Sequence, residues 1–318
     1  MNESDVLIVG GGAAGLAAGL VLLRARRNVV IVDSGTPRNA PAAHMHGFLS
    51  RDGVSPAAFL AAGRAELRRY GGTIVDGTVS SLARPDSAAC GFQAALTDGS
   101  TIAARRVLVA TGLHDVLPDI LGVSERWGKD LLHCPYCHGW EVRDQPIGVL
   151  GGNPEAVQHA LLLRQWSSDV LLLPGLTMPG LDELEALSAR DVRVVPGGVH
   201  SLVVENDHVT GVRLDDGSVI ARSALFVRPR FRPNADLLVD LGCEIDRDGW
   251  VRHDATGRTT VGGVWVAGNI RNARAQVITA AGEGSAAAIA LNADLVNEDT
   301  AQALARRRGL TLHLDARP

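Results

Sequence analysis

The sequence predicts an α/β protein built from two Rossmann-like units with parallel sheets. Its 318 residues are enough for two domains or for one large α/β unit. Glycine is frequent, with 36 residues, and glycine-rich turns separate runs of Val, Ile, Leu and Ala, which is typical of parallel sheets covered on both faces. A pattern of strand, glycine turn, helix and strand occurs near the start and again in the middle of the chain.

The first unit has every part of a β-α-β motif. An apolar strand at 5–9 leads into the turn GGGAAG at 10–15. An apolar helix at 16–23 follows, and then a second strand at 28–32. Asp33 ends that strand, about 20 residues after the glycines, as in the dinucleotide-binding pattern G-x-G-x-x-G. An ordinary glycine-rich turn would not require this strand, helix and acidic residue together.

Each glycine of this turn has a physical task. Gly10 permits the tight turn, Gly12 lets the backbone approach a pyrophosphate, and Gly15 lets the helix pack close to the strand. The free N–H groups at the helix N-terminus, beside Ala14, attract phosphate. Asp33 can accept hydrogen bonds from a ribose. We therefore predict a dinucleotide site at this turn.

The second unit carries a degraded form of the motif. We expect a strand at 147–150, a helix at 156–166 and a strand at 169–173. Asn153 stands where a glycine would approach the phosphates. The second strand ends in Pro-Gly, with neither an acid for a ribose nor arginines for a 2′-phosphate. The sequence leaves two alternatives open, weak dinucleotide binding or a retained fold with little affinity for NAD(P)H.

A third glycine-rich zone lies near the C-terminus. A buried strand at 263–269 ends in Gly-Asn, and QVITAAGEG at 276–284 opens a long alanine-rich helix. The N-terminus of that helix can hold an anionic group, such as the pyrimidine edge of a reduced flavin. LVATG at 108–112 resembles a strand and turn that join the two halves of the chain.

The stretch HCPYCHGWE raises three chemical possibilities. Cys134, Cys137 and His138 form C-x-x-C-H, the attachment signature of a c-type haem. The same residues could be half of a zinc site, or a redox dithiol. Among four cysteines there is one close pair, so a structural zinc site would lack its other half, and nothing in the sequence indicates the export that haem attachment requires. We therefore favour the redox dithiol.

Composition excludes several other classes. The net charge of −4 comes with no dominant basic face, so we expect no nucleic-acid partner. The N-terminus is acidic, unlike a signal peptide, and the longest apolar run, 13–23, is too short for a bilayer, so we expect a cytoplasmic protein without a membrane span. Cysteines stay reduced there unless they are catalytic or bind metal. We expect Cys90 and Cys243 to be buried apolar residues, and no metal site.

The order of these motifs resembles the thioredoxin-reductase branch of the flavoprotein disulfide reductases, over nearly the whole chain. The resemblance implies an FAD-binding domain from 1–114 and 239–318, with an inserted NAD(P)-type domain at 115–238 that carries the C-x-x-C, and a homodimer. It implies an FAD site at Gly10, Gly12, Ala14, Gly15, Asp33, Thr111, Gly112, Gly268, Asn269, Gln276 and Val277.

Three departures from the family pattern stand out. Family reductases carry an acidic residue where this chain has His138, an arginine-rich stretch where it has LLLPGLTMPG, and Gly-Asp where it has Gly268-Asn269. The block CPYCHGWE instead resembles the subgroup that oxidises small-molecule dithiols in natural-product pathways, such as those of holomycin and gliotoxin.

The resemblance implies that Cys137 faces the flavin and Cys134 exchanges with substrate. His138 titrates near neutrality and can take protons from substrate thiols, whose pKa is about 8.5. We expect a dithiol oxidase that uses oxygen and forms hydrogen peroxide. An NAD(P)H-dependent disulfide reductase and a redox sensor are the alternatives. His133 is a weaker candidate base, and Tyr136 and Trp140 either line an apolar substrate pocket or simply pack.

Overall fold

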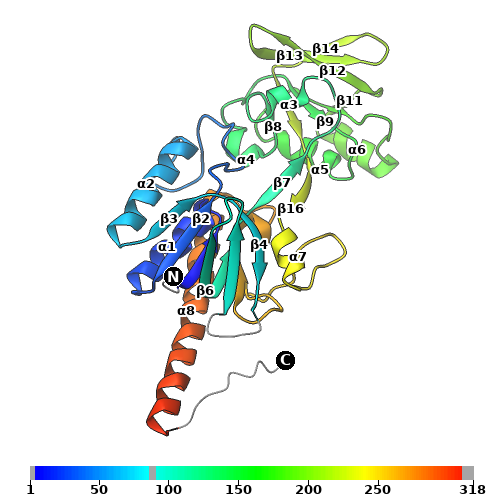
Figure 1. Ribbon diagram of the computed structural model, residues 1–318. Coiled ribbons are helices and arrows are strands. Elements are labelled where there is room, and N and C mark those ends of the chain that lie inside the picture. Colours follow the sequence, from blue (N-terminus) through cyan, green and yellow to red (C-terminus); the bar gives the residue numbers. More distant parts are fainter. Residues whose placement is uncertain (1–3, 86–90, 310–318) are drawn as a thin grey trace. The chain divides into compact units, whose positions relative to one another are not determined.

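The computed structural model describes residues 4–85 and 91–309, so Cys90 lies outside the described residues. The chain divides into two compact units (Figure 1). The first consists of Met1–Pro37, Ala57–Leu113 and Pro233–Pro318, and the second of Arg38–Pro56 and His114–Arg232. These limits differ from the predicted ones mainly at 38–56, which groups with the second unit.

The first unit is built on a mixed sheet. In the described part of the chain it is seven-stranded, with the order β3-β2-β1-β6-β5-β4 and β17 paired to β6. The strands β1, β2, β3, β6 and β17 are parallel, whereas β4 and β5 form an antiparallel extension. Their bounds are β1 Ser4–Val9, β2 Val29–Asp33, β3 Thr73–Asp76, β4 Val79–Ala83, β5 Phe92–Leu96, β6 Thr101–Val109 and β17 Val264–Val266.

Two helices of this unit pack against each other and bury a common core. Helix α1 (Ala13–Arg24) and the long helix α8 (Val277–Arg307) share a cluster that includes Leu22, Leu291 and Trp265, all buried. The other helices are α2 (Pro56–Arg69), α7 (Asp236–Asp240) and the short 3-10 helix η1 (Gly268–Ile270).

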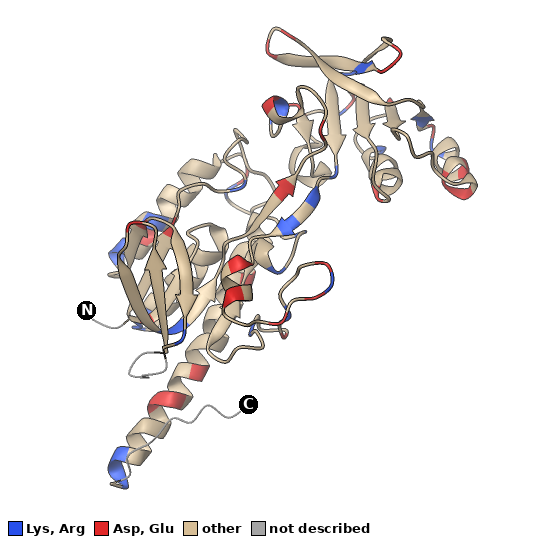
Figure 2. Cartoon of the chain, turned by 45° about the vertical axis from the view of Figure 1, so that its right-hand side comes forward, with Lys and Arg blue, Asp and Glu red and all other residues tan. Residues whose placement is uncertain are grey.

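Ion pairs connect the C-terminal half of α8 to strand β6. Arg105 on β6 pairs with Asp299 at 2.5 Å, and Arg106 pairs with Glu298 at 2.6 Å. Arg27 reaches the same Asp299 at 2.7 Å. Acidic residues thus lie along α8, and basic residues follow at its C-terminal end (Figure 2). The basic end suits the negative pole of the helix dipole.

The second unit contains the second Rossmann-like sheet. In the described residues, its five strands are parallel, with the order β11-β10-β9-β15-β8. Their bounds are β8 Leu131–Leu132, β9 Ile147–Leu150, β10 Val170–Leu173, β11 Arg193–Val194 and β15 Ala224–Val227. Strands β9, β10 and β15 are buried on both faces, as their unbroken apolar sequences predict. Both sheets confirm the predicted fold class.

The rest of this unit consists of short helices, an antiparallel sheet and a ribbon. The helices are α3 (Val123–Arg126), α4 (Pro135–His138), α5 (Ala156–Leu163) and α6 (Leu181–Ala189). The antiparallel sheet consists of β12 (Val199–Glu205), β13 (His208–Leu214) and β14 (Val219–Ala221). Strands β7 (Leu113–Val116) and β16 (Arg230–Pro233) pair where the chain passes between the units. In the part of the chain that the structure describes, no helix has the length and apolarity that a bilayer span needs.

Candidate active site

The first glycine turn has room for a pyrophosphate. Gly10 has a φ of +106° and donates its N–H to the Val32 carbonyl at 2.8 Å. A Cβ at Gly15 would lie 1.9 Å from the Gly10 carbonyl oxygen, so the helix and turn approach as closely as the motif predicts. A Cβ at Gly12, just before α1, would meet no atom within 4 Å. This open space at a helix N-terminus fits the pyrophosphate of FAD.

Asp33 lies beside this turn, and both of its carboxylate oxygens have partners. Oδ1 accepts a hydrogen bond from the Gly11 N–H at 3.0 Å, and Oδ2 pairs with the guanidinium of Arg64 on α2. Arg64 also pairs with Asp76 at 3.0 Å. Asp33 thus ends β2 beside the glycine turn, and its role as a ribose acceptor stays a prediction. The sequence did not reveal its ion pair with Arg64, which would compete with a ribose for the carboxylate.

Thr111 and Gly112 lie at the end of one segment of the first unit and form hydrogen bonds with Asn234, at the start of the next segment. The Thr111 hydroxyl donates to the Asn234 carbonyl at 2.9 Å, and the Asn234 amide donates to the Thr111 carbonyl at 2.8 Å. The Asn234 N–H donates to the Gly112 carbonyl at 3.1 Å. A Cβ at Gly10 would lie 3.2 Å from the Thr111 nitrogen, so this corner borders the glycine turn.

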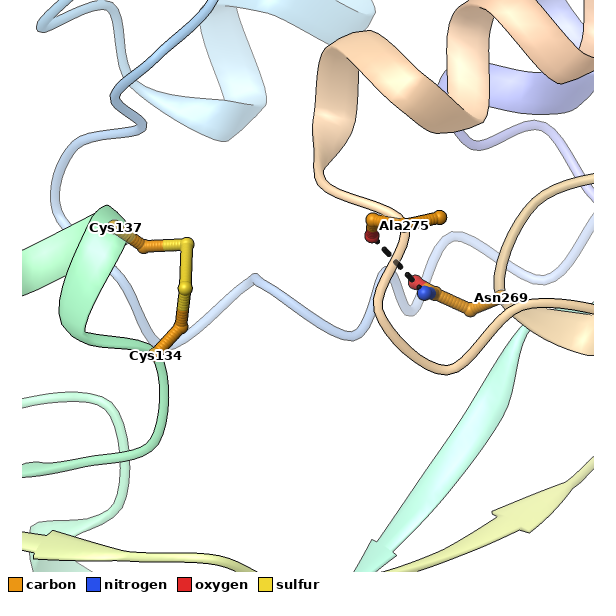
Figure 3. The surroundings of a disulfide bond; sticks show 4 residues. All are labelled: Cys134, Cys137, Asn269 and Ala275. Carbon is orange, nitrogen blue, oxygen red and sulfur yellow. Dashed lines mark hydrogen bonds between the residues drawn. A yellow bond between two sulfur atoms is a disulfide. The ribbon is translucent and has the colours of Figure 1, made fainter. Parts of the chain in front are cut away.

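Asn269 braces the loop that leads into α8. Its amide Nδ2 donates to the Asn272 carbonyl at 3.0 Å and to the Ala275 carbonyl at 3.0 Å, and Figure 3 shows the second of these bonds. The Glu283 carboxylate accepts from the Gly268 N–H at 2.9 Å and from the Asn272 amide at 2.7 Å. A carboxylate at position 269 would have no proton to donate to these carbonyls. The asparagine therefore matches the geometry of this loop.

Small residues bring α8 and α1 together at the same place. A Cβ at Gly284 would lie 2.0 Å from the Ala14 carbonyl oxygen, and one at Gly268 would lie 2.9 Å from the Ala14 Cβ. Helix α8 begins at Val277, after the N-cap Gln276. The first unit thus gathers the predicted FAD positions around the N-termini of two helices, although they come from both ends of the sequence.

Cys134 and Cys137 form a disulfide in the second unit (Figure 3). Cys134 is the N-cap of α4 and Cys137 lies within it, with Cα atoms 5.3 Å apart. Pro135 at the first helical position has the φ that a helix start needs. This is the oxidised form that a redox dithiol would take. Among the residues that the structure describes, no group of three or more His, Cys, Asp or Glu is arranged to hold a metal ion.

Histidines lie on both sides of the disulfide. Burial lowers the pKa of His138, which ends α4, below its ordinary value of 6.5, while the charge of Glu141 opposes this decrease. Burial and the nearby charges of Arg38 and Arg228 lower the pKa of His133 to about 3. A ring with so low a pKa is a poor base at neutral pH, so His138 remains the predicted base.

A third histidine near the dithiol was missed from the sequence. His46 belongs to the 38–56 segment and lies between two carboxylates. Its Nδ1 is 3.2 Å from Asp52 Oδ2, and its Nε2 is 3.5 Å from Glu141 Oε1. No local motif marks His46 or Asp52, because they precede the dithiol by a long stretch of chain.

Two exposed aromatic residues lie in the dithiol segment, one between the cysteines on α4 and one just after α4. Tyr136 is 64% exposed and Trp140 is 65% exposed. The ring of Tyr136 meets Trp166 edge-on at 5.6 Å, and the guanidinium of Arg143 lies 4.1 Å from the Trp140 ring centroid. Their exposure suits contact with an apolar substrate better than a place in the core. Cys243, by contrast, is buried as predicted, and burial raises the pKa of its thiol.

The second glycine turn carries Asn153 at the position where the first turn has Gly12. Asn153 donates its amide to the Arg228 carbonyl at 3.2 Å, and its Oδ1 is buried with no hydrogen-bond partner among the residues that the structure describes. Leu176 in the loop after β10 is 93% exposed, and Leu181, which begins α6, is 86% exposed. These residues offer no positive charge for a 2′-phosphate.

Comparison with known proteins places the chain among flavin-dependent disulfide oxidoreductases. The family model described as pyridine nucleotide-disulphide oxidoreductase matches residues 4–284. The chain is 33% identical to thioredoxin reductase sirT of Leptosphaeria maculans, over 93% of this chain and 96% of the relative. It is 28% identical to thioredoxin reductase of Helicobacter pylori, over 90% and 97%.

Solved structures give the same result. The crystal structure of HlmI matches with a TM-score of 0.93 and 55% identity, over 96% of this chain and 97% of the other. Putative thioredoxin reductase TrxB from Bacillus anthracis matches with a TM-score of 0.88 and 32% identity, over 93% and 99%. The chain therefore belongs to the pyridine nucleotide-disulphide oxidoreductase family and is an FAD-binding, thioredoxin-reductase-like flavoprotein.

Proposed function

We propose that this flavoprotein oxidises a small-molecule dithiol to an intramolecular disulfide, with oxygen as electron acceptor and hydrogen peroxide as product. The observation that carries the proposal is the disulfide Cys134–Cys137 followed directly by His138. A neutral histidine at this position can accept protons, which substrate thiols must lose before they react. An acid there would better serve the reverse reaction.

The chain's own residues supply the exchange chemistry. His138 takes a proton from one substrate thiol, and the thiolate attacks Cys134 Sγ, which breaks the 134–137 bond and releases Cys137 as a thiolate. The second substrate thiol loses its proton to His138 once that ring is neutral again, and its thiolate attacks the substrate sulfur of the mixed disulfide, which forms the substrate disulfide and releases Cys134 as a thiolate. FAD bound at the glycine turn of the first unit would supply the acceptor for the two electrons of this thiolate pair, and the two electrons and two protons would then reduce oxygen to hydrogen peroxide. The sum is R(SH)₂ + O₂ → RS₂ + H₂O₂.

The exposed aromatic side chains support a small organic substrate. Tyr136 and Trp140 present ring surface on the segment that carries the dithiol. A planar apolar molecule that carries two thiols can stack on such rings. We propose Cys134 as the exchanging sulfur and Cys137 as the sulfur next to the flavin. A homodimer and a cytoplasmic setting are parts of the same proposal.

A second candidate is an NAD(P)H-dependent disulfide reductase. The names of the thioredoxin reductase relatives favour it. Two features of the second glycine turn speak against it. The Asn153 side chain bonds back to the Arg228 carbonyl, in the position where a glycine would leave room for phosphates. The loop that follows β10, PGLTMPG at 174–180, contains no arginine.

Anaerobic reduction separates the two functions. The purified yellow protein is mixed, without oxygen, with NADPH or with reduced dithiothreitol as a small dithiol probe. The oxidase predicts that the dithiol alone bleaches the flavin absorbance and that readmitted air restores it with formation of peroxide. Bleaching by NADPH but not by the dithiol would reject the oxidase and select the reductase.

A further inference from the structure

A closed loop fixes a histidine close to the dithiol helix in the second unit. The Met45 N–H donates to the Val54 carbonyl at 2.9 Å, and the Gly53 N–H donates to the Met45 carbonyl at 2.9 Å. The Met45 side chain is only 5% exposed and anchors the loop. These bonds tie both ends of the loop together, so His46 has a defined position.

The ring of His46 has an acidic partner at each nitrogen. Asp52 lies 3.2 Å from Nδ1, and Glu141 lies 3.5 Å from Nε2. The Gly47 N–H donates to the other oxygen of Asp52 at 2.8 Å and so orients that carboxylate. His46, in the middle of this row, is the least exposed side chain at 22%, whereas Glu141 is 43% exposed and Asp52 is 66% exposed. The row therefore ends in solvent.

Glu141, at the other end of the row, follows His138 by three residues in the chain. Burial lowers the pKa of His138, the charge of Glu141 raises it and the charge of His46 lowers it. Both side chains are thus close enough to influence the predicted base. Another titratable neighbour of His46 is the exposed His44, whose ring lies 6.5 Å from that of His46, centroid to centroid.

The proposed reaction must find acceptors for two protons. When a dithiol becomes a disulfide, two S–H bonds break and one S–S bond forms. The two electrons pass to the enzyme disulfide, whose sulfur atoms leave as two thiolates. Two protons must therefore leave the substrate in this half-reaction, whereas the imidazole of His138 accepts only one.

We propose that His46 is the second proton acceptor of the dithiol site. Glu141 takes the first proton from His138 and passes it to His46, and Asp52 keeps the resulting imidazolium paired until water removes the proton. His138 is then free to accept the second proton. The inference rests on the proposed dithiol oxidation. His46 acts through His138, so it is a positioning and proton-transfer residue rather than a catalytic one.

The test compares His46→Gln and Glu141→Gln with the matched control His44→Gln in the full flavoprotein. Stopped-flow absorbance follows anaerobic flavin bleaching by reduced dithiothreitol across the neutral pH range, with and without added imidazole. We expect His46→Gln to bleach about tenfold more slowly or worse. Imidazole should restore the rate of this variant and of Glu141→Gln, because a free base replaces the missing relay. The wild type and His44→Gln should not respond to imidazole.

The failures of the two proposals have different signatures. If the dithiol bleaches the wild type, and His46→Gln matches it at every pH without an imidazole response, the relay is wrong while the oxidase stands. If NADPH alone bleaches the wild type, the oxidase itself is wrong. Should His46→Gln lose its flavin, Glu141→Gln decides the matter, since unchanged rates in that variant also overturn the relay.

Discussion

Asn269 illustrates how a single amide can determine a loop. Its Nδ2 donates to the carbonyls of Asn272 and Ala275, each at 3.0 Å, just before α8 begins at Val277. The family pattern has an aspartate at this position, which would not donate these bonds. The departure noted in the sequence therefore reflects a different way of holding the N-terminus of α8.

Asn269→Asp should weaken this loop. The variant loses two hydrogen bonds, each worth about 1 kcal/mol, and places a negative charge beside two carbonyl oxygens. We expect the free energy of unfolding to fall by about 2 kcal/mol and the affinity for FAD to fall with it. Chemical denaturation and flavin titration measure both effects. Asn206→Asp, at an exposed turn, is the control, and equal losses in the two variants would contradict the assignment.

The pH dependence of dithiol oxidation should report His138. Because burial lowers the pKa of His138, the ring is neutral and able to accept a proton at pH values below 6.5. The rate should fall only when the pH drops through that lowered pKa, since the protonated ring accepts no proton. His138→Gln should reduce the rate about 100-fold and abolish this acid limb, whereas His208→Gln, on an exposed position of β13, should change neither.

The candidate site residues that the sequence offers belong to compact motifs. The cysteine pair and His138 are adjacent in the chain, and the glycines of the first turn are closely spaced, so their chemistry can be recognised locally. His46 and Asp52 could not be predicted in the same way, because only the folded loop at 45–54 brings them to Glu141. Arg64 was missed as the partner of Asp33 for the same reason.

In the first strand–turn–helix element, two glycines have different tasks. Gly15 allows the helix to pack against the turn, whereas Gly12 leaves space for a ligand. A Cβ at Gly15 would overlap the Gly10 carbonyl, whereas one at Gly12 meets nothing. We expect Gly15→Ala to lower the free energy of unfolding by about 4 kcal/mol or more and to prevent folding.

Gly12→Val should keep the apoprotein's melting temperature close to that of the wild type but abolish FAD binding, because its side chain fills the pyrophosphate space. Circular dichroism and flavin content measure these outcomes, and full flavin content in Gly12→Val would contradict the placement of the pyrophosphate.

Apolar runs and turn residues predicted the main parallel strands well. The strand expected at 147–150 is β9, and the helix expected at 156–166 is α5, which ends earlier, at Leu163. The helix expected at 16–23 begins earlier, at Ala13, within the glycine turn itself. The antiparallel strands β12, β13 and β14 were not predicted, since their alternating, half-exposed residues give a weaker signal than buried strands.

For the whole molecule, buried neutral histidines should make stability depend on pH. Burial lowers the pKa of His133 to about 3 and that of His159 to about 4. In the unfolded chain these rings titrate near 6.5, so the unfolded state binds more protons below that pH. Their contribution to the free energy of unfolding is complete above pH 6.5. It falls by about 1.4 kcal/mol per pH unit for each histidine, down to about pH 4 for His159 and about pH 3 for His133.

His159→Leu tests this dependence. The leucine keeps an apolar contact with the ring of Phe226, which His159 meets edge-on at 5.8 Å. Denaturation at a series of pH values should show a smaller loss of stability on acidification in the variant than in the wild type. The exposed His200→Leu should retain the wild-type slope. Identical slopes in all three proteins would show that His159 is protonated in the folded state.

The proposed reaction requires electron transfer from one cysteine pair to FAD. The most direct measurement is oxygen consumption by Cys134→Ser with a reduced dithiol, compared with the wild type and with the control Cys243→Ser at the buried free cysteine. We predict that Cys134→Ser stays yellow with full FAD content and consumes no oxygen above background, while Cys243→Ser behaves as the wild type. Undiminished oxygen uptake by Cys134→Ser would contradict the proposed route of the electrons.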